Sequence, residues 1–495
     1  MLESILSFFN KDEIISWFVY DPSNPLMFNT TLFWGIFVIF FGVYSITKNC
    51  RTFRTIYVLL FSLFYYYKVG GFFVLLLIAS VLFNFIFSES MDLSTKQWKR
   101  RLYLTFTIVI NLGVLGYYKY TNFFIDNINS AFSTNFALHH IILPIGISFY
   151  TFQAISYSID LYRKQMKPAK SILDFAFYLC FFPQLVAGPI VRAKVFLPQM
   201  RNKMLLTKKD AALALFMIMM GLIKKSVISD YISLNFIDRI YDDPLRYTSI
   251  ENLLATYGYT IQIYCDFSGY SDIAIGLALL MGFKLPPNFH TPYKSGSVTE
   301  FWKRWHISLS SWLRDYLYIP LGGNRKGKVR TYINLFLTML IGGLWHGASW
   351  KFIVWGGLHG IALAIERFFK QFIKLPNNFV VRLICIVLTF HFVSFCWIFF
   401  RADSFETAEM LISNIGRISF NPDEWIAVIE AYKNVFILML IGYTLHFLPE
   451  RFVNWVKKGF QWLPFPIMAI IFGFVFWLVY ATATSGPQPF IYFKF

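Results

Sequence analysis

Long apolar runs separated by short polar segments dominate the chain from residue 31 to residue 482. Most of these runs approach the roughly 20 residues that an α-helix needs to cross about 30 Å of hydrocarbon. The pattern predicts an all-α polytopic integral membrane protein with about twelve membrane-spanning helices. The predicted spans are 31–47, 54–68, 70–88, 102–120, 141–161, 210–229, 253–282, 331–347, 350–368, 381–400, 433–449 and 464–482.

Two segments break the alternation of spans and short connections. Residues 171–191 are apolar, but basic residues flank them on both sides, and Pro183 and Pro189 interrupt any helix. Residues 285–330 are too charged to cross the membrane and too aromatic for a plain loop. Irregular backbone at membrane depth is tolerated only where it is buried in protein or lines a wet cavity. We therefore expect both segments to be re-entrant and to border a functional interior.

The basic residues between the spans indicate the orientation of the chain. Lys and Arg cluster in the connections 48–54, 89–101 and 162–170, whereas 121–140 has none and 401–432 is dominated by acidic residues. Because short basic connections stay on the cytoplasmic side, the first three belong inside and the other two outside. With an even number of spans, both termini are then expected outside.

Composition supports the membrane class and narrows the function. Hydrophobic residues make up 57% of the chain and charged residues 15%, below the roughly 25% charged that is typical of soluble domains. The net charge of +18 could indicate nucleic acid, but the basic residues lie in short segments between apolar runs, so we expect no nucleic-acid partner. The five cysteines form no CxxC pair, which argues against a disulfide framework or a zinc site.

Among the eight histidines, His306 and His346 stand out as candidate catalytic groups. His306 lies in the second irregular segment and His346 at the end of the next span, so the fold could bring them together. A buried, neutral imidazole suits a general base that removes a proton from a hydroxyl. The glycines beside His346, at 342, 343 and 347, allow either close approach of a substrate or tight helix packing, and their spacing does not decide between the two.

Other chemistries lack their motifs. The sequence has no HExxH or other dense metal-binding cluster, no GxxxxGK[ST] and no GxSxG, so we expect no metal. Among the carboxylates, Asp315 could orient a ring nitrogen of His306 or pair with Arg314. Asp266 and Asp272 are spaced too far for one helical face, so they are not a ready catalytic pair.

Five blocks of sequence together resemble a known family. In chain order they read PQLVAGPIVRA, IYCDFSGYSDIAIGLALLMGFKLPPNF, EFWKRWHISLSSWLRDYLYIPLGGNRKG, LIGGLWHGASWKFIVWGGLHG and PFIYFKF. The set is similar to the bacterial membrane-bound O-acyltransferases, above all to the branch that contains the membrane subunit of alginate O-acetylation and is related to the teichoic acid D-alanyl transferase. The resemblance runs from Met27 to Phe495, which implies one transmembrane acyltransferase domain over 27–495 and an extension, 1–26, on the outer surface.

The resemblance implies a reaction as well as a fold. It makes His346 the catalytic histidine and His306 the second one, in a central tunnel that joins the two membrane faces. An acyl group would pass from a cytoplasmic thioester across the bacterial inner membrane for O-acylation of an extracytoplasmic polysaccharide. Acetyl from acetyl-CoA is favoured over D-alanyl or another acyl group from a carrier protein, because the chain length and the loop 401–432 look more like the acetylation branch.

Basic residues on the predicted inner side could hold the donor. Lys303, Arg304 and Arg314 could bind the phosphates of coenzyme A or an acidic carrier protein. The alternative is that they only follow the positive-inside rule. A solute transporter would use the same interior as a path, but it predicts an inverted repeat between the two halves, which the sequence does not show.

The aromatic C-terminus has two interpretations. Its rings could anchor the last helix at the membrane interface among the lipids. The resemblance adds that Tyr492 could act as an acyl acceptor at the outer mouth of the tunnel, since a similar aromatic tail occurs on a partner protein in the D-alanylation system. A serine-type extracytoplasmic acyltransferase would then take the acyl group from Tyr492 to the polysaccharide.

Overall fold

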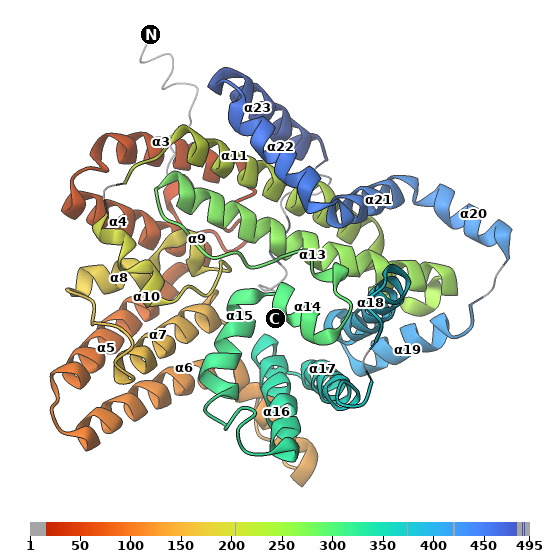
Figure 1. The fold of residues 1–495 in the computed structure, drawn as a ribbon, viewed down its shortest axis with the longest axis horizontal. Helices are drawn as coiled ribbons and strands as arrows, with labels where there is room; N and C mark the ends of the chain where they lie inside the picture. Colours follow the sequence, from red (N-terminus) through yellow and green to blue (C-terminus); the bar gives the residue numbers. More distant parts are fainter. Residues whose placement is uncertain are drawn as a thin grey trace. The chain divides into compact units, whose positions relative to one another are not determined.

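The computed structural model describes residues 16–202, 204–373, 375–418, 421–482, 488 and 490, and this part of the chain is built from helices and loops without strands (Figure 1). The chain divides into two compact units. The first comprises Met1–Thr207 with Leu277–Leu285, and the second comprises Lys208–Gly276 with Pro286–Phe495. The expected single domain over 27–495 stays a prediction.

The first unit has an aromatic core. Its helices are α3 (Thr31–Thr47), α4 (Arg51–Gly70), α5 (Val74–Leu93), α6 (Gln97–Phe132), α7 (Ile147–Tyr162), α8 (Ile172–Cys180), α9 (Phe182–Leu185) and α10 (Ala193–Phe196). Phe182 is fully buried, and its ring lies 5.1 Å from that of Phe61 and 5.7 Å from that of Tyr65. Such ring contacts add to the burial of apolar surface that holds α9 against α4.

The predicted interruption within residues 171–191 is confirmed. The segment forms α8, with 9 residues, and α9, with 4, and the backbone turns between them at Phe181. Pro183 lies in the first turn of α9, where its missing N–H has no helical partner to lose. Both helices are too short to cross a membrane alone.

The second unit holds the candidate site. Its helices are α11 (Lys208–Leu222), α12 (Asp238–Asp242), α13 (Ser249–Leu280), α14 (Val298–Arg304), α15 (Ile307–Leu313), α16 (Lys328–His346), α17 (Trp350–Phe369), α18 (Phe379–Arg401), α19 (Phe405–Ile415), α20 (Pro422–Ala431), α21 (Lys433–Phe447), α22 (Glu450–Trp462) and α23 (Phe465–Thr482). Helices α16, α17 and α18 pack side by side in chain order (Figure 1). The charged segment 285–330 contains the short helices α14 and α15, of 7 residues each, a 3-10 turn (Pro292–Lys294), a π-helical turn (Arg314–Tyr318) and the start of α16, so it does not cross the membrane as one helix.

Seven helical stretches in the described part of the chain are long and apolar enough to cross a membrane, or up to eight if the bent pair Pro422–Ala431 and Lys433–Phe447 forms one span. The all-helical, polytopic character is confirmed, whereas the predicted number of about twelve spans is not. Helices α4 and α5 continue through a single 3-10 turn, so Arg51–Leu93 counts as one stretch of 43 residues. Helix α3, with 17 residues, is shorter than a typical span.

Glycines bring α16 and α17 into close contact. A Cβ added at Gly343 would lie 2.2 Å from the carbonyl oxygen of Phe352, and one added at Gly356 would lie 2.4 Å from that of Met339. A Cβ at Gly347 would lie 2.1 Å from the ring of Phe352. Tight packing of helix against helix therefore accounts for Gly343 and Gly347, which the sequence left undecided.

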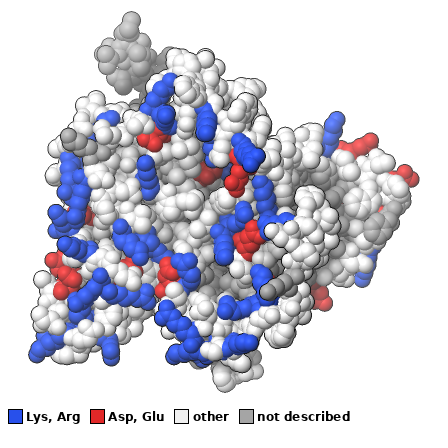
Figure 2. All heavy atoms as spheres, viewed as in Figure 1, with Lys and Arg blue, Asp and Glu red and all other residues white. Residues whose placement is uncertain are grey.

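Ion pairs within the second unit hold the carboxylates of α13, of which Asp266 is buried and Asp272 is partly exposed. Lys225 Nζ lies 2.7 Å from Asp230 Oδ1 and 2.6 Å from Asp266 Oδ1. Lys224 pairs with Asp272 at 2.5 Å. Because isolated charges inside a membrane bundle are costly, this pairing is what allows them to be buried there. Elsewhere Lys and Arg outnumber Asp and Glu on the face drawn in Figure 2, in keeping with the net charge of +18.

Candidate active site

His346 is the last residue of α16 and lies in an aromatic surround. Only 2% of its surface is exposed. Its ring centroid lies 5.0 Å from that of Trp355, 5.1 Å from that of Trp345 and 5.3 Å from that of Phe400, and all three rings meet it edge to face. These rings exclude bulk water from the imidazole, which strengthens any electrostatic interaction made there.

His306 lies 40 residues before His346 in the sequence, but its ring is close to that of Trp345, which also contacts His346. It is fully buried, and its ring is 4.6 Å from that of Phe267 and 6.1 Å from that of Trp345. Trp345 therefore contacts both histidines, as the fold was expected to allow. Burial lowers the pKa of the His306 imidazole to about 3, so the ring is neutral at ordinary pH.

The backbone at His306 is unusual. Its φ and ψ are +42° and +55°, in the left-handed region that a residue with a Cβ rarely adopts. Two backbone hydrogen bonds hold this conformation, from Ile307 N to the Asn288 carbonyl at 2.9 Å and from His290 N to the Arg304 carbonyl at 2.9 Å. Conformations of this kind cost about 1–3 kcal/mol and cluster at functional sites.

The residue that holds the His306 ring is Asn288, and not Asp315, which the sequence offered as one of two alternatives. Asn288 Oδ1 lies 3.1 Å from His306 Nδ1 and also accepts from Ser308 Oγ at 2.9 Å. Asp315 instead accepts from Arg314 Nε at 2.7 Å, which is the ion pair that the sequence offered as the alternative. The sequence analysis did not single out Asn288, because nothing in its spacing points to a residue 18 positions further along.

A cavity of about 540 Å³ is lined by residues of α14, α15, α16 and α17. Two of the three predicted donor-binding residues, Lys303 and Arg314, line it together with Trp302, and the structure thus brings them to one place. The remaining lining combines apolar, polar and charged residues: Thr299, Ile307, Ser310, Ser311, Leu313, Tyr318, Leu335, Thr338, Met339, Leu363, Glu366, Arg367 and Lys370. Such a cavity suits a ligand with an anionic part and an apolar part.

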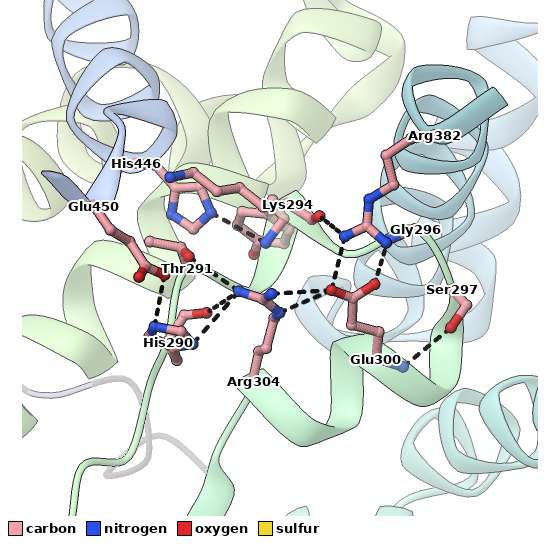
Figure 3. A network of polar contacts seen from close by, with 11 residues as sticks. His290, Thr291, Lys294, Gly296, Ser297, Glu300, Arg304, Arg382, His446 and Glu450 are labelled. Atoms are coloured by element: carbon pink, nitrogen blue, oxygen red, sulfur yellow. Dashed lines mark hydrogen bonds and ion pairs between the residues drawn. The ribbon is translucent and has the colours of Figure 1, made fainter. Parts of the chain in front are cut away.

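Arg304, the third predicted donor-binding residue, belongs to a different cluster (Figure 3). Its Nη2 lies 3.0 Å from Glu300 Oε1, and its Nη1 donates to the carbonyl of His290 at 3.2 Å. Arg382 Nη2 donates to the same Glu300 oxygen at 2.8 Å. Burial alone would raise the pKa of Glu300, but hydrogen bonds from Arg382 and the Gly296 N–H, with the two guanidinium charges, hold it below its usual range. Glu300 thus links α14 to Arg382 of α18, and Arg304 joins Glu300 to the backbone at His290.

A short run of rings connects the cavity with His346. Trp302 lines the cavity, and its ring lies 5.7 Å from that of Trp355, which in turn lies 5.0 Å from that of His346. His359 fills the space beside them, 5.0 Å from Trp355, and its Nδ1 accepts a hydrogen bond from Trp302 Nε1 at 3.3 Å. Two ring contacts therefore separate the cavity wall from the candidate catalytic histidine.

Two predicted features have no counterpart that can be described. Tyr492 lies outside the described residues, as does the extension up to residue 15. Among the residues that are described, no group of three or more His, Cys, Asp or Glu side chains could hold a metal ion. His306, His346 and the polar groups around them are the candidate functional side chains of this site.

Comparison with known proteins places this arrangement in context. The model of the membrane-bound O-acyltransferase family, MBOAT, matches residues 167–400, which include both histidines. The peptidoglycan O-acetyltransferase of Helicobacter pylori is 34% identical over 525 residues, covering 95% of this chain and 98% of that protein. The probable alginate O-acetylase AlgI of Pseudomonas putida is 36% identical over 496 residues, covering 95% and 100%. The teichoic acid D-alanyltransferase of Bacillus subtilis is 31% identical over 284 residues, covering 54% and 71%.

Proposed function

This chain belongs to the membrane-bound O-acyltransferase family, and we propose that it moves an acetyl group from a cytoplasmic thioester across the membrane for O-acetylation of an extracytoplasmic polysaccharide. It is a multi-pass membrane acyltransferase, which removes the transporter alternative. The names of its relatives include acetylation of both alginate and peptidoglycan, so the proposed acceptor is a polysaccharide hydroxyl without a finer assignment.

The observation that supports the proposal most strongly is the cavity that lies two ring contacts from His346. Lys303 and Arg314 would supply positive charge for the phosphates of acetyl-CoA, and the apolar lining residues would accommodate the pantetheine arm. The thioester end would pass Trp302 toward His346, which is two ring contacts away. A cavity of about 540 Å³ lies in the range of small-molecule sites, so it would hold part of the donor rather than the whole.

The proposed chemistry uses His346 as a general base. The acceptor hydroxyl oxygen attacks the thioester carbonyl carbon and forms the ester C–O bond, while the C–S bond breaks. His346 takes the hydroxyl proton and returns it to the leaving thiolate, so a thiol departs and the ring ends neutral. The second histidine, His306, positions the substrate through a hydrogen bond to a group other than the reacting hydroxyl, whose one proton goes to His346. The dry aromatic surround limits hydrolysis of the thioester by water.

The charge distribution supports the proposed direction and location. The basic connections 48–54, 89–101 and 162–170 would face the cytoplasm, with both termini outside the bacterial inner membrane. The central tunnel that would join the two faces is part of the proposal. The donor would therefore enter from the basic side, where acetyl-CoA is made.

The C-terminal tail would carry the acetyl group out of the tunnel. Tyr492 is a phenol, whose ester is more reactive than an alkyl ester, so it could accept the group and pass it to a separate serine-type transferase. Tyr492→Phe keeps the ring and removes the oxygen. We expect this variant to lose polysaccharide acetylation, measured as ester content of the isolated polymer. Acetylation at the normal rate would reduce the tail to a membrane anchor.

A carrier-bound D-alanyl donor is the second candidate. The 31% identity to a teichoic acid D-alanyltransferase favours it, but that similarity covers 54% of this chain against 95% for the acetylating relatives. The two donors can be separated with purified protein, because only the one that is used will release its free thiol carrier.

The test of the proposal is acetyl transfer by purified protein in lipid with labelled acetyl-CoA. His346→Ala should lower the rate by about 10²–10⁴-fold, since that is the usual contribution of a general base. His391→Ala is the matched control, because His391 is exposed on α18 and its ring nitrogen meets only a backbone carbonyl of its own helix. Equal rates in the two variants would overturn the role of His346.

A further inference from the structure

We propose that Asn288 is a positioning residue that fixes His306 in a single tautomer, with the hydrogen on Nδ1 and with Nε2 presented as the hydrogen-bond acceptor. The inference rests on the proposed function, because it assigns to His306 a part in acyl transfer. It adds a residue and an atom. Asn288 sets the orientation of the His306 ring, and Nε2 is the nitrogen that accepts a hydrogen bond from a substrate N–H or O–H group other than the reacting hydroxyl.

The orientation of the Asn288 amide is fixed by its neighbours. The backbone N–H of Ser308 can only donate, and it lies 3.3 Å from the atom assigned as Oδ1. On the other side, Nδ2 donates to Ser271 Oγ of α13 at 3.3 Å. A flipped amide would place two donors, the N–H of Ser308 and the amide NH₂, against each other, so the assigned orientation is the one that the contacts support.

The tautomer of His306 follows from this orientation. Asn288 Oδ1 has only lone pairs to offer, and it lies 3.1 Å from His306 Nδ1, so Nδ1 must carry the hydrogen. Ser308 Oγ gives its one hydrogen to the same Oδ1 at 2.9 Å, and therefore cannot donate to Nδ1 as well. In a neutral ring the second nitrogen, Nε2, is then the acceptor.

Asn288 holds the backbone of His306 together with its ring. Its carbonyl accepts the N–H of Ile307 at 2.9 Å, directly after the residue with φ of +42°. The ring is further confined by Phe267, whose plane meets it at 88° with centroids 4.6 Å apart. Asn288 thus sets both the backbone dihedral angles and the ring orientation of His306. This matters for the rate, because a misplacement of about 1 Å at a reacting centre can cost about 100-fold.

The structure also explains why the residue that accepts the hydrogen bond from His306 Nδ1 is an amide rather than a carboxylate. An imidazole held by a neutral oxygen remains a weak base and keeps Nε2 as a hydrogen-bond acceptor. A carboxylate at the same place would stabilise the protonated ring, in which both nitrogens are donors. As the pH falls, Nε2 would then carry a hydrogen, and it could no longer accept the hydrogen bond that positions the substrate.

Two substitutions at Asn288 separate these effects. Asn288→Leu removes the acceptor at similar volume, and we expect kcat to fall at least tenfold with little change in the KM for acetyl-CoA. Asn288→Asp keeps an oxygen for all three donors, so we expect it to recover most of kcat at high pH and to move the acid limb of the kcat profile to higher pH. If Asn288→Leu does not fold, the pH profile of Asn288→Asp still tests whether Asn288 positions His306.

A double variant distinguishes this proposal from the function on which it rests. In a His306→Ala background, Asn288→Leu should cause no further loss of kcat, because its effect passes through His306. An equal loss in both backgrounds, or an unmoved acid limb in Asn288→Asp, would overturn the positioning role while leaving the enzyme's function intact. A fully active His306→Ala variant would overturn the role of His306 and this inference together. Asn84→Leu is the control for loss of a buried amide, since Asn84 pairs with Asn111 in the first unit.

Discussion

Gly343→Ala is expected to inactivate the enzyme without touching either histidine. The added methyl would lie 2.2 Å from the Phe352 carbonyl oxygen and 3.0 Å from Gly356 Cα, both of which are backbone atoms of α17. Backbone cannot rotate away as a side chain can, so α16 and α17 must separate. To restore an ordinary contact of 3.4 Å, the helices have to move apart by about 1.2 Å near this point.

That displacement reaches the candidate site directly. His346 ends α16 only three residues after Gly343, and Trp355 lies on α17, so their 5.0 Å ring contact spans the two helices that separate. A shift of about 1 Å at a reacting centre typically costs about 100-fold in rate. Overpacking should also cost about 1–3 kcal/mol of stability. We therefore expect kcat to fall about 100-fold, with a lowered thermal midpoint.

The assay is acetyl-CoA turnover per folded molecule, with folding measured by size-exclusion chromatography and thermal melting in detergent. Gly473→Ala is the matched control, because a Cβ at Gly473 on α23 would have no heavy atom within 4 Å and alanine favours the helix by about 1 kcal/mol. It should melt no lower than the parent protein and keep its kcat. A Gly343→Ala protein with the kcat of the control would refute the reasoning that the α16–α17 contact positions His346.

Two further predictions concern the donor and the orientation. Lys303→Ala and Arg314→Ala should each raise the KM for acetyl-CoA by about tenfold, because each variant loses one charged hydrogen bond to the donor. Unchanged KM values would argue against the cavity as the donor site. With the exposed Cys50 replaced by serine, single cysteines placed in 121–140 should react with an impermeant reagent from outside intact cells, and those placed in 163–170 should not; the reverse pattern would invert the proposed direction.

The sequence was sufficient for the helical membrane class because the hydrophobic effect acts on whole runs of residues. It also singled out His306 and His346, which the structure places against one tryptophan ring, that of Trp345. The number of spans was less predictable, because an apolar run does not show whether two helices join, as α4 and α5 do through one short turn.

The groups around the histidines were harder to predict because they come from distant parts of the chain. Asp315 was a reasonable partner for His306 by charge, but it pairs with Arg314, its neighbour in sequence. Asn288 reaches His306 only because its segment folds back along Trp305–Ser308, which depends on a left-handed backbone that no local pattern encodes. Similarly, Arg304 and Lys303 are adjacent in sequence, yet only Lys303 lines the cavity.

The central claim is that one chain carries an acetyl group from a cytoplasmic thioester to the other side of the membrane through His346. A vesicle assay tests this claim most directly. The vesicles contain the purified protein and its transferase partner, with acetyl-CoA labelled in the acetyl group on one side only and polysaccharide on the other side. We predict labelled ester on the polysaccharide with the parent protein, and at least 100-fold less with His346→Ala. Label that reaches the polymer only when donor and acceptor share one compartment, or equally with His346→Ala, would contradict the account.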